Sequence, residues 1–365
     1  MHVVICGGGV IGACTAYFLA RRGIDVTVVE RCEVASSASG KAGGFLARDW
    51  CRGSPLDPLA RRSFALHASL RDEIGVDWGY QRLTAYSGLV VGAHDRRRHA
   101  AAALAWLSDG ILIADQLSTT ETTAIVHPRS FTLAMMHAAE RHGARLHRGQ
   151  LSGLAHGGKL DGVEIDGATM PADAVVIAMG PWSLQAAQWL RIPPVFGQQS
   201  PSLVYDSGSD VPAEALFLDY QEDDGNAVMI EVFPRADGST HVTAFSDSAP
   251  LPLDPADVKP APEAITRLQK ICERLSPAFR ADRIVARQAC FRPVTQDGLP
   301  LIGKVPGCEG AYIATGHSVW GILNAPATGE AMTELIANGV ASTIDLAPFA
   351  PARLRPLDPS QIRIG

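Results

Sequence analysis

The chain opens with HVVICGGGVIG (residues 2–12), and a second apolar run, VTVVE (residues 26–30), follows it. Val3–Cys6 has the length and composition of a buried parallel strand, and it leads directly into the glycine motif GxGxxG at residues 7–12. Small and apolar residues then recur at helical spacing as far as Ala20. A strand, a glycine turn, a helix and a second strand in this order predict a βαβ unit that binds a dinucleotide.

Each part of this unit has a separate physical role. Gly7 lets the chain turn tightly out of the strand, Gly9 has no Cβ to hold a pyrophosphate away, and Gly12 lets the helix lie close to the sheet. The helix N-terminus offers free N–H groups and the positive end of its dipole to phosphates. Glu30, at the end of the second strand, can accept hydrogen bonds from a ribose diol and would repel a 2′-phosphate. We therefore expect a cofactor that contains adenine and is not NADP.

Composition limits the class of protein. The chain has 365 residues, 47% hydrophobic and 19% charged, which is ordinary for a soluble enzyme with two domains or one large one. Its formal charge of −6 argues against nucleic acid or an anionic membrane surface as a partner. No apolar run approaches the ~20 residues that span a bilayer. We expect small-molecule partners and no membrane insertion.

The cysteines indicate a compartment. There are seven of them, scattered along the chain, odd in number and without a CxxC pair. This usage favours a reducing environment, and we predict the cytoplasm. Because the first strand begins at residue 2, we expect no signal or transit peptide.

Apolar periodicity and turn residues predict most of the remaining elements. We expect helices at residues 56–75, 94–107, 131–142, 264–275 and 327–337. We expect strands at residues 83–93, 144–147, 174–179, 227–233, 241–245 and 311–314, hairpin strands within 151–165, and connecting structure at 115–124. The stretch 31–45 consists mainly of small and hydroxyl side chains, which favours a loop that lines the cofactor over a plain surface loop.

Three further motifs follow the βαβ unit. They are the strand VIAMGPW at 176–182, the motif R-P-x-T-x-D-G-x-P-x-x-G at 292–303, and G-H-x-x-x-G-I at 316–322. With these motifs the chain resembles, over nearly its whole length, the FAD-dependent D-amino acid oxidase family, which includes glycine oxidase and sarcosine oxidase. Residues 39–51 also resemble a less characterised subgroup of that family, for which no substrate is agreed.

The resemblance implies an α/β fold with two interleaved domains. One is a Rossmann-like FAD-binding domain of the glutathione reductase type, which we assign to residues 1–82, 125–194 and 286–365. The other is a substrate domain with an antiparallel sheet, which we assign to residues 83–124 and 195–285. The residues implied to bind FAD are Gly7, Gly9, Val10, Ile11, Gly12, Glu30, Arg31, Ser37, Ser39, Gly40, Lys41, Ala42, Gly43, Gly44, Gly180, Trp182, Arg292, Gly316, His317, Trp320, Gly321 and Ile322.

The implied chemistry is oxidation of a C–N bond in a small amine or amino acid. The carbon beside the amine gives up a hydride to the flavin, the imine product hydrolyses, and oxygen is the expected electron acceptor. Two alternatives stay open: a dehydrogenase that passes electrons to a quinone or protein, and a non-catalytic FAD-binding protein with a regulatory role. A reductase dependent on NAD(P)H is disfavoured, because a second glycine motif and a redox CxxC are missing from the sequence.

Four residues are candidates for contact with the substrate or the reacting atoms. In the resemblance, Arg292 holds a substrate carboxylate, although an ion pair with Asp297 is the structural alternative. Arg48 lies near the position of a carboxylate-binding arginine in sarcosine oxidase relatives, and a solvated arginine is its alternative. His317 is implied to touch flavin or substrate, and Lys41 to assist oxygen activation or hold a phosphate. No metal-ligand set or Ser-His-Asp set stands out.

Cys290 bears on how the flavin is held. It lies two residues before Arg292, near the position at which sarcosine oxidase relatives tether the flavin through a cysteine sulfur. Glycine oxidase relatives have a small residue there, and the neighbouring Arg-Pro matches them better. We expect non-covalent FAD, with a covalent link at Cys290 as the alternative.

Overall fold

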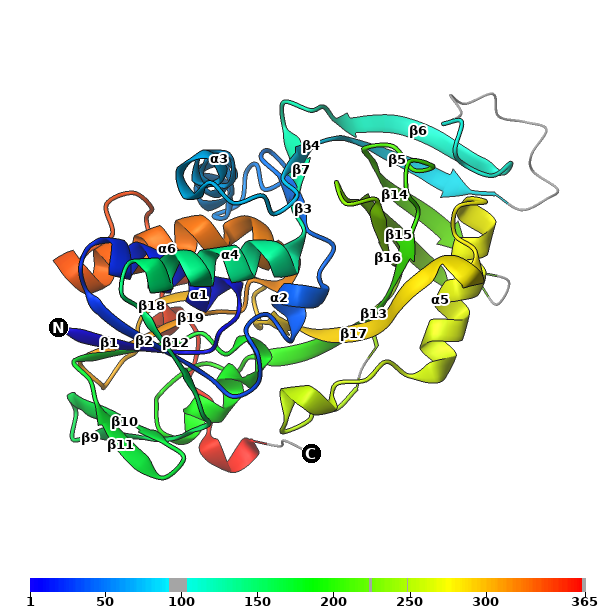
Figure 1. Cartoon of the computed structure of the whole chain (residues 1–365). Helices are drawn as coiled ribbons and strands as arrows, with labels where there is room; N and C mark the ends of the chain where they lie inside the picture. Colours follow the sequence, from blue (N-terminus) through cyan, green and yellow to red (C-terminus); the bar gives the residue numbers. More distant parts are fainter. Residues whose placement is uncertain (92–103, 223–224, 248, 363–365) are drawn as a thin grey trace.

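Two large sheets organise the chain, one toward each end of the molecule in Figure 1. The structure is a computed structural model that describes residues 1–91, 104–222, 225–247 and 249–362. The predicted α/β class, with a parallel nucleotide-binding sheet and a second antiparallel sheet, is confirmed.

The first sheet has six strands, and its centre is the opening strand of the chain. Their order is β18 (Leu301–Lys304), β19 (Ala311–Thr315), β12 (Ala174–Ile177), β1 (His2–Cys6), β2 (Asp25–Glu30) and β8 (Arg145–Arg148). All neighbours are parallel except β18, which runs antiparallel to β19. The carboxyl ends of β1, β2, β12 and β19 therefore meet at one edge, where ligands bind in open α/β sheets.

Helices cover one face of this sheet. They are α1 (Val10–Arg21), α3 (Asp57–Ile74), α4 (Pro128–Arg141) and α6 (Gly321–Asn338). The backbones of α1 and α6 approach closely at Gly329, which allows this because it has no Cβ. A Cβ there would lie 2.7 Å from the carbonyl carbon of Cys14. The other face is packed by the three-stranded sheet β9 (Leu151–His156), β10 (Leu160–Ile165) and β11 (Ala168–Pro171). Among the described residues, no helix is both long enough and apolar enough to span a bilayer.

The second sheet has seven strands. Their order is β17 (Ile284–Val294), β13 (Phe196–Asp206), β16 (Ser239–Thr243), β15 (Ala227–Pro234), β14 (Glu214–Gln221), β5 (Thr84–Val90) and β6 (Ile111–Ser118). Only the β14–β5 pair is parallel. One face packs against α5 (Pro262–Leu275), as expected from the apolar stripe of that helix. The opposite face is consequently free to contribute to a site.

Three sequence predictions need correction or comment. Residues 115–124 are not plain connecting structure, since they contain the end of β6 and the start of β7 (Thr123–Ile125), which pairs with β3 (Phe45–Ala47) and β4 (Gln81–Arg82). Most of the predicted helix 94–107 lies outside the described residues. The last helix begins at Gly321 rather than 327 and includes Pro326.

The domain limits stay a proposal. The boundary predicted at 195 falls just before β13. The boundary at 286 falls inside β17, which pairs with β13 along its whole length in the seven-stranded sheet. We therefore propose that the third segment of the FAD-binding domain begins after Val294 instead.

Candidate active site

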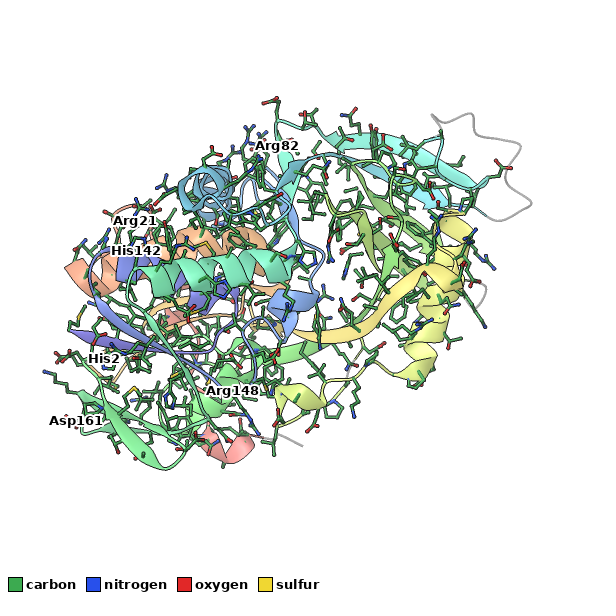
Figure 2. All side chains as sticks on the ribbon, in the orientation of Figure 1. His2, Arg21, Arg82, His142, Arg148 and Asp161 are labelled. Carbon is green, nitrogen blue, oxygen red and sulfur yellow. The ribbon has the colours of Figure 1, made fainter. Side chains whose placement is uncertain are left out.

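A cavity of about 440 Å³ lies where the two sheets face each other. Its walls come from the βαβ turn, the small-residue stretch 31–45, the free face of the seven-stranded sheet, and residues 314–322. A second hollow of about 490 Å³ adjoins it and shares Arg31, Ser36 and Lys41. Arg148, labelled in Figure 2 at the end of β8, also lines this hollow. Both spaces thus open beside the carboxyl edge of the parallel sheet.

The glycines of the βαβ turn are required by close backbone contacts. Gly7 has φ of 114°, and a Cβ there would lie 2.4 Å from the carbonyl oxygen of Ala178, the residue after β12. A Cβ on Gly12 would lie 2.0 Å from the carbonyl oxygen of Gly7. Both distances are far below van der Waals contact, so no larger residue fits without moving the backbone.

The N-terminus of α1 faces the cavity without a side-chain cap of its own. Gly9 is the N-cap residue and has no side chain, and the Val10 amide donates to Ser39 Oγ at 2.9 Å. The other N–H groups of the first turn point the same way along the helix axis, toward its N-terminus. Gly9, Val10 and Ile11 at this end line the cavity. Unpaired N–H groups and the helix dipole make this end suited to a phosphate.

Glu30 is fixed by two backbone amides. Its Oε2 accepts from Gly8 N at 2.7 Å and its Oε1 from Cys32 N at 2.8 Å. Because each carboxylate oxygen has two lone pairs, both oxygens retain capacity for a ribose diol in the cavity. The adjacent Arg31 forms an ion pair with Asp254 at 2.8 Å. This contact joins the end of β2 to the proline-rich connecting segment at residues 250–262.

The small-residue stretch 31–45 folds over the cavity and is held from the second sheet. The buried Arg235 donates to the carbonyl oxygen of Ala42 at 2.8 Å, and Gly43 lies against the ring of Phe233, where a Cβ would come within 2.3 Å. Lys41 stands in this stretch half-buried, and burial lowers the pKa of its ammonium group. Lys41 is therefore a cavity-lining cation and not a solvated loop residue.

Residues 314–322, at the end of β19 and beyond it, form another part of the wall, at the same edge of the sheet as the βαβ turn. Gly316 has φ of 80°, and a Cβ on it would lie 2.6 Å from Thr295 Cγ2. His317 is buried, with Nε2 within 3.1 Å of Thr328 Oγ1 and no partner for Nδ1 among the described residues. Trp182 and Trp320 line the same cavity, and Trp182 Nε1 donates to Pro252 O at 2.8 Å.

Arg292 projects into the cavity from β17. Its guanidinium donates to Ser246 Oγ, and its buried Nε has no protein partner among the described residues. The alternative of an ion pair with Asp297 is wrong, because Asp297 pairs with Arg353 at 2.7 Å. Arg292 therefore keeps donors available for a ligand.

Arg48 does not belong to this site. It is absent from the cavity lining, and its guanidinium pairs with the adjacent Asp49 at 2.9 Å, a carboxylate that Arg61 also contacts. Because the Arg48 guanidinium is already paired with a neighbouring carboxylate, we no longer consider Arg48 a substrate-binding candidate. Gly12, Gly40 and Gly316 also lie behind the lining rather than in it, where they permit close packing.

The remaining predicted residues are brought together. Those that line the cavity are Gly7, Gly9, Val10, Ile11, Glu30, Arg31, Ser37, Ser39, Lys41, Ala42, Gly43, Gly44, Gly180, Trp182, Arg292, His317, Trp320, Gly321 and Ile322. They come from segments more than 300 residues apart in sequence, and the fold places them around one space.

The free face of the seven-stranded sheet adds residues that sequence reasoning missed. Strand register sets Phe217, Glu231 and Thr243 opposite one another on β14, β15 and β16. All three line the cavity, together with Ser200, Ser202, Met229, Phe233 and His241. The alternation of residues 227–233 was a usable signal, since it separates Met229, Glu231 and Phe233 from the apolar residues that pack on α5.

Comparison with known proteins identifies the family. A family model described as FAD dependent oxidoreductase (DAO) matches residues 2–335, which is most of the chain. The chain belongs to the DAO family of FAD-dependent oxidoreductases. The resemblance found in the sequence is thereby confirmed.

Individual DAO relatives are distant. A glycine oxidase from Pseudomonas aeruginosa is 29% identical, with 96% of this chain and 98% of that protein covered. A putative oxidoreductase from Schizosaccharomyces pombe is 28% identical, with 94% and 96% covered. Among solved structures, glycine oxidase from Geobacillus kaustophilus superposes with a TM-score of 0.79 at 26% identity, covering 96% of this chain and 98% of that one.

The cavity fits the FAD of this family. The glycine cradle at residues 7–12, the uncapped helix N-terminus and the fixed carboxylate of Glu30 match a pyrophosphate and a ribose. Lys41, His317 and Trp320 line the same cavity and would contact the flavin part of the cofactor. Bound FAD would supply a two-electron acceptor for hydride.

His317 also provides a test of burial through pH. Burial lowers its pKa to about 3, whereas in the unfolded chain it ionises near 6.5. Between these values only the unfolded chain binds the proton, so stability falls as the pH drops from 6.5 toward 3. We expect His317→Asn to reduce the slope of unfolding free energy against pH by about 1.4 kcal/mol per unit between pH 4 and 6, measured by urea titration.

The exposed His137 on α4 is the matched control. We expect His137→Asn to leave the slope near that of the unmodified protein. Equal slopes for His317→Asn and the unmodified protein would show that His317 is not held neutral in the folded state.

Proposed function

We propose that this DAO protein oxidises the C–N bond of a small amine that carries a carboxylate. The observation that supports this most directly is Arg292, which lines the cavity with unpaired donors. A guanidinium of this kind binds a carboxylate through two parallel hydrogen bonds. The glycine oxidases among the relatives favour the same reaction class.

The protein's own groups bind and orient the substrate. Arg292, backed by Ser246, fixes the carboxylate end. The aromatic side chains of Phe45, Phe217 and Phe233 line the same cavity and give it apolar surface that would keep water from a bound substrate. His317, neutral at ordinary pH because burial depresses its pKa, contributes hydrogen-bonding nitrogens without a charge.

Peroxide production over a panel of amines tests the reaction. We expect the yellow, FAD-loaded protein to release peroxide with at least one compound among glycine, sarcosine, D- and L-amino acids and cyclic imino acids. Dye reduction without peroxide would favour the alternative dehydrogenase that uses a quinone or protein acceptor. Flavin that stays oxidised anaerobically with every amine would favour a non-catalytic FAD-binding role.

We further infer that the flavin is bound non-covalently. Cys290 lines the cavity but is 8% exposed, and burial raises the pKa of its thiol despite the nearby Lys41 and Arg292. A thiol that resists ionisation is a poor nucleophile for attachment to the flavin.

We expect acid precipitation to leave all of the yellow colour in the supernatant, and Cys290→Ser to retain the same flavin-to-protein absorbance ratio. Colour in the pellet that Cys290→Ser abolishes would establish a covalent link.

A reducing compartment is consistent with the thiols. All seven cysteines are free, and six of them are buried. We propose the cytoplasm as the site of action and oxygen as the acceptor, and the peroxide assay above tests the second point.

A further inference from the structure

Glu231 is an acidic side chain at the centre of an otherwise largely apolar part of the cavity. It lies in the middle of β15, between Met229 and Phe233 on the same face of the sheet. The register places Phe217 opposite it on β14 and Thr243 opposite it on β16. Met229, Phe217 and Phe233 offer this carboxylate no hydrogen bond.

Glu231 has no protein partner to offset this burial. Among the described residues, neither carboxylate oxygen takes part in a hydrogen bond or an ion pair. Burial raises its pKa, and Arg292 lies close enough for its positive charge to oppose that rise without forming an ion pair. Because a buried charge is costly unless paired, an acid left open to a cavity is suited to a cationic ligand.

Aromatic rings frame the same position. The ring centroids of Phe217 and Phe233 are 5.6 Å apart, and that of Phe45 lies 5.3 Å from Phe217. Trp50 closes the group at 4.8 Å from Phe217. Ring faces attract cations and offer apolar area to a substituent. The position therefore suits an ammonium group that carries or adjoins an apolar group.

Glu231 and Arg292 stand on β15 and β17, with β16 and β13 between them. Both side chains line the cavity, so opposite charges face one space from separate strands. A ligand that carries both an anion and a cation can satisfy both, whereas a carboxylate alone leaves Glu231 unpaired. Glycine carries both charges but would leave the aromatic rings without a contact.

We propose that Glu231, framed by Phe217 and Phe233, binds the amino group of the substrate, and that the cavity selects amino acids with an apolar substituent over glycine. The inference rests on the proposed function, because it takes the carboxylate of the same substrate to lie at Arg292. It adds a second binding residue and a substrate class.

Calorimetric binding to the FAD-loaded protein tests the proposal without turnover. The probes are α-methylphenylalanine and 2-aminoisobutyrate, which have no hydrogen on the α-carbon, and 2-methyl-3-phenylpropanoate, which has no amine. We expect α-methylphenylalanine to bind at least tenfold more tightly than either of the other probes. Glu231→Gln should weaken α-methylphenylalanine about 10- to 100-fold and leave the amine-free probe within threefold. Glu231→Ala should give the same pattern if glutamine disturbs the packing.

Asp219→Asn is the matched control, since Asp219 is an exposed acid on the neighbouring β14 and does not line the cavity. It should bind every probe like the unmodified protein. The proposal is overturned if the Glu231 variants bind α-methylphenylalanine unchanged, if they weaken both aromatic probes equally, or if 2-aminoisobutyrate binds as tightly as α-methylphenylalanine. Failure of the proposed function would give a different result. Arg292→Met would then bind the amine-free carboxylate with unchanged affinity, while Glu231→Gln would still weaken the binding of α-methylphenylalanine.

Discussion

Gly12→Ala is expected to lose FAD. The added Cβ would lie 2.0 Å from the carbonyl oxygen of Gly7 and 3.3 Å from Ile5 Cγ2, so the start of α1 must move away from β1. Alanine gains about 1 kcal/mol of helix propensity over glycine, but overpacking against a backbone atom costs about 1–3 kcal/mol or more, and the clash prevails. We expect the flavin-to-protein absorbance ratio to fall roughly 10-fold or more under dilute conditions.

Gly157→Ala is the control for this substitution. Gly157 lies in an exposed turn, and a Cβ there would meet no atom within 4 Å. We expect this variant to purify with the full flavin content and an unchanged melting temperature. A Gly12→Ala protein as yellow as the control would mean that the close packing at Gly12 does not govern cofactor binding.

Arg292→Met is expected to remove the carboxylate selectivity of the reaction. The Arg292 guanidinium lines the cavity, and its buried Nε has no partner among the described residues. Replacing the guanidinium with a thioether therefore removes both hydrogen-bond donors that a substrate carboxylate would use. Loss of one member of a buried charge pair costs about 2–5 kcal/mol, which is roughly a 30- to 5000-fold loss in kcat/KM. Arg292→Lys should recover only part of this, because lysine keeps the charge without the bidentate geometry.

Arg287→Met tests whether the effect is specific to the cavity. Arg287 lies on the same strand, β17, but its exposed side chain projects from the opposite face of the sheet. We expect its kcat/KM to stay within twofold of the unmodified protein. A carboxylated amine oxidised equally well by Arg292→Met and the unmodified protein would remove Arg292 from substrate binding.

Elements that sequence periodicity could not detect are mainly edge strands and irregular segments. β6 and β17 form the two edges of the seven-stranded sheet, and neither keeps the alternation of buried and exposed residues along its whole length. β17 also contains Pro293, a residue that weakens the sequence signal of a strand and that edge strands tolerate. The family resemblance singled out Arg292, which lines the cavity, but it could not show that Arg48 forms an ion pair with Asp49.

The sequence by itself determined the nucleotide-binding half of this protein. Gly12 and Glu30 act through backbone contacts within one βαβ unit, and such local requirements leave a direct trace in residue type and spacing. Only the tertiary structure decided the other half of the site. Glu231 and Arg292 acquire a shared role from strand order and register, which bring distant segments onto one face of a sheet, and no local pattern encodes that pairing.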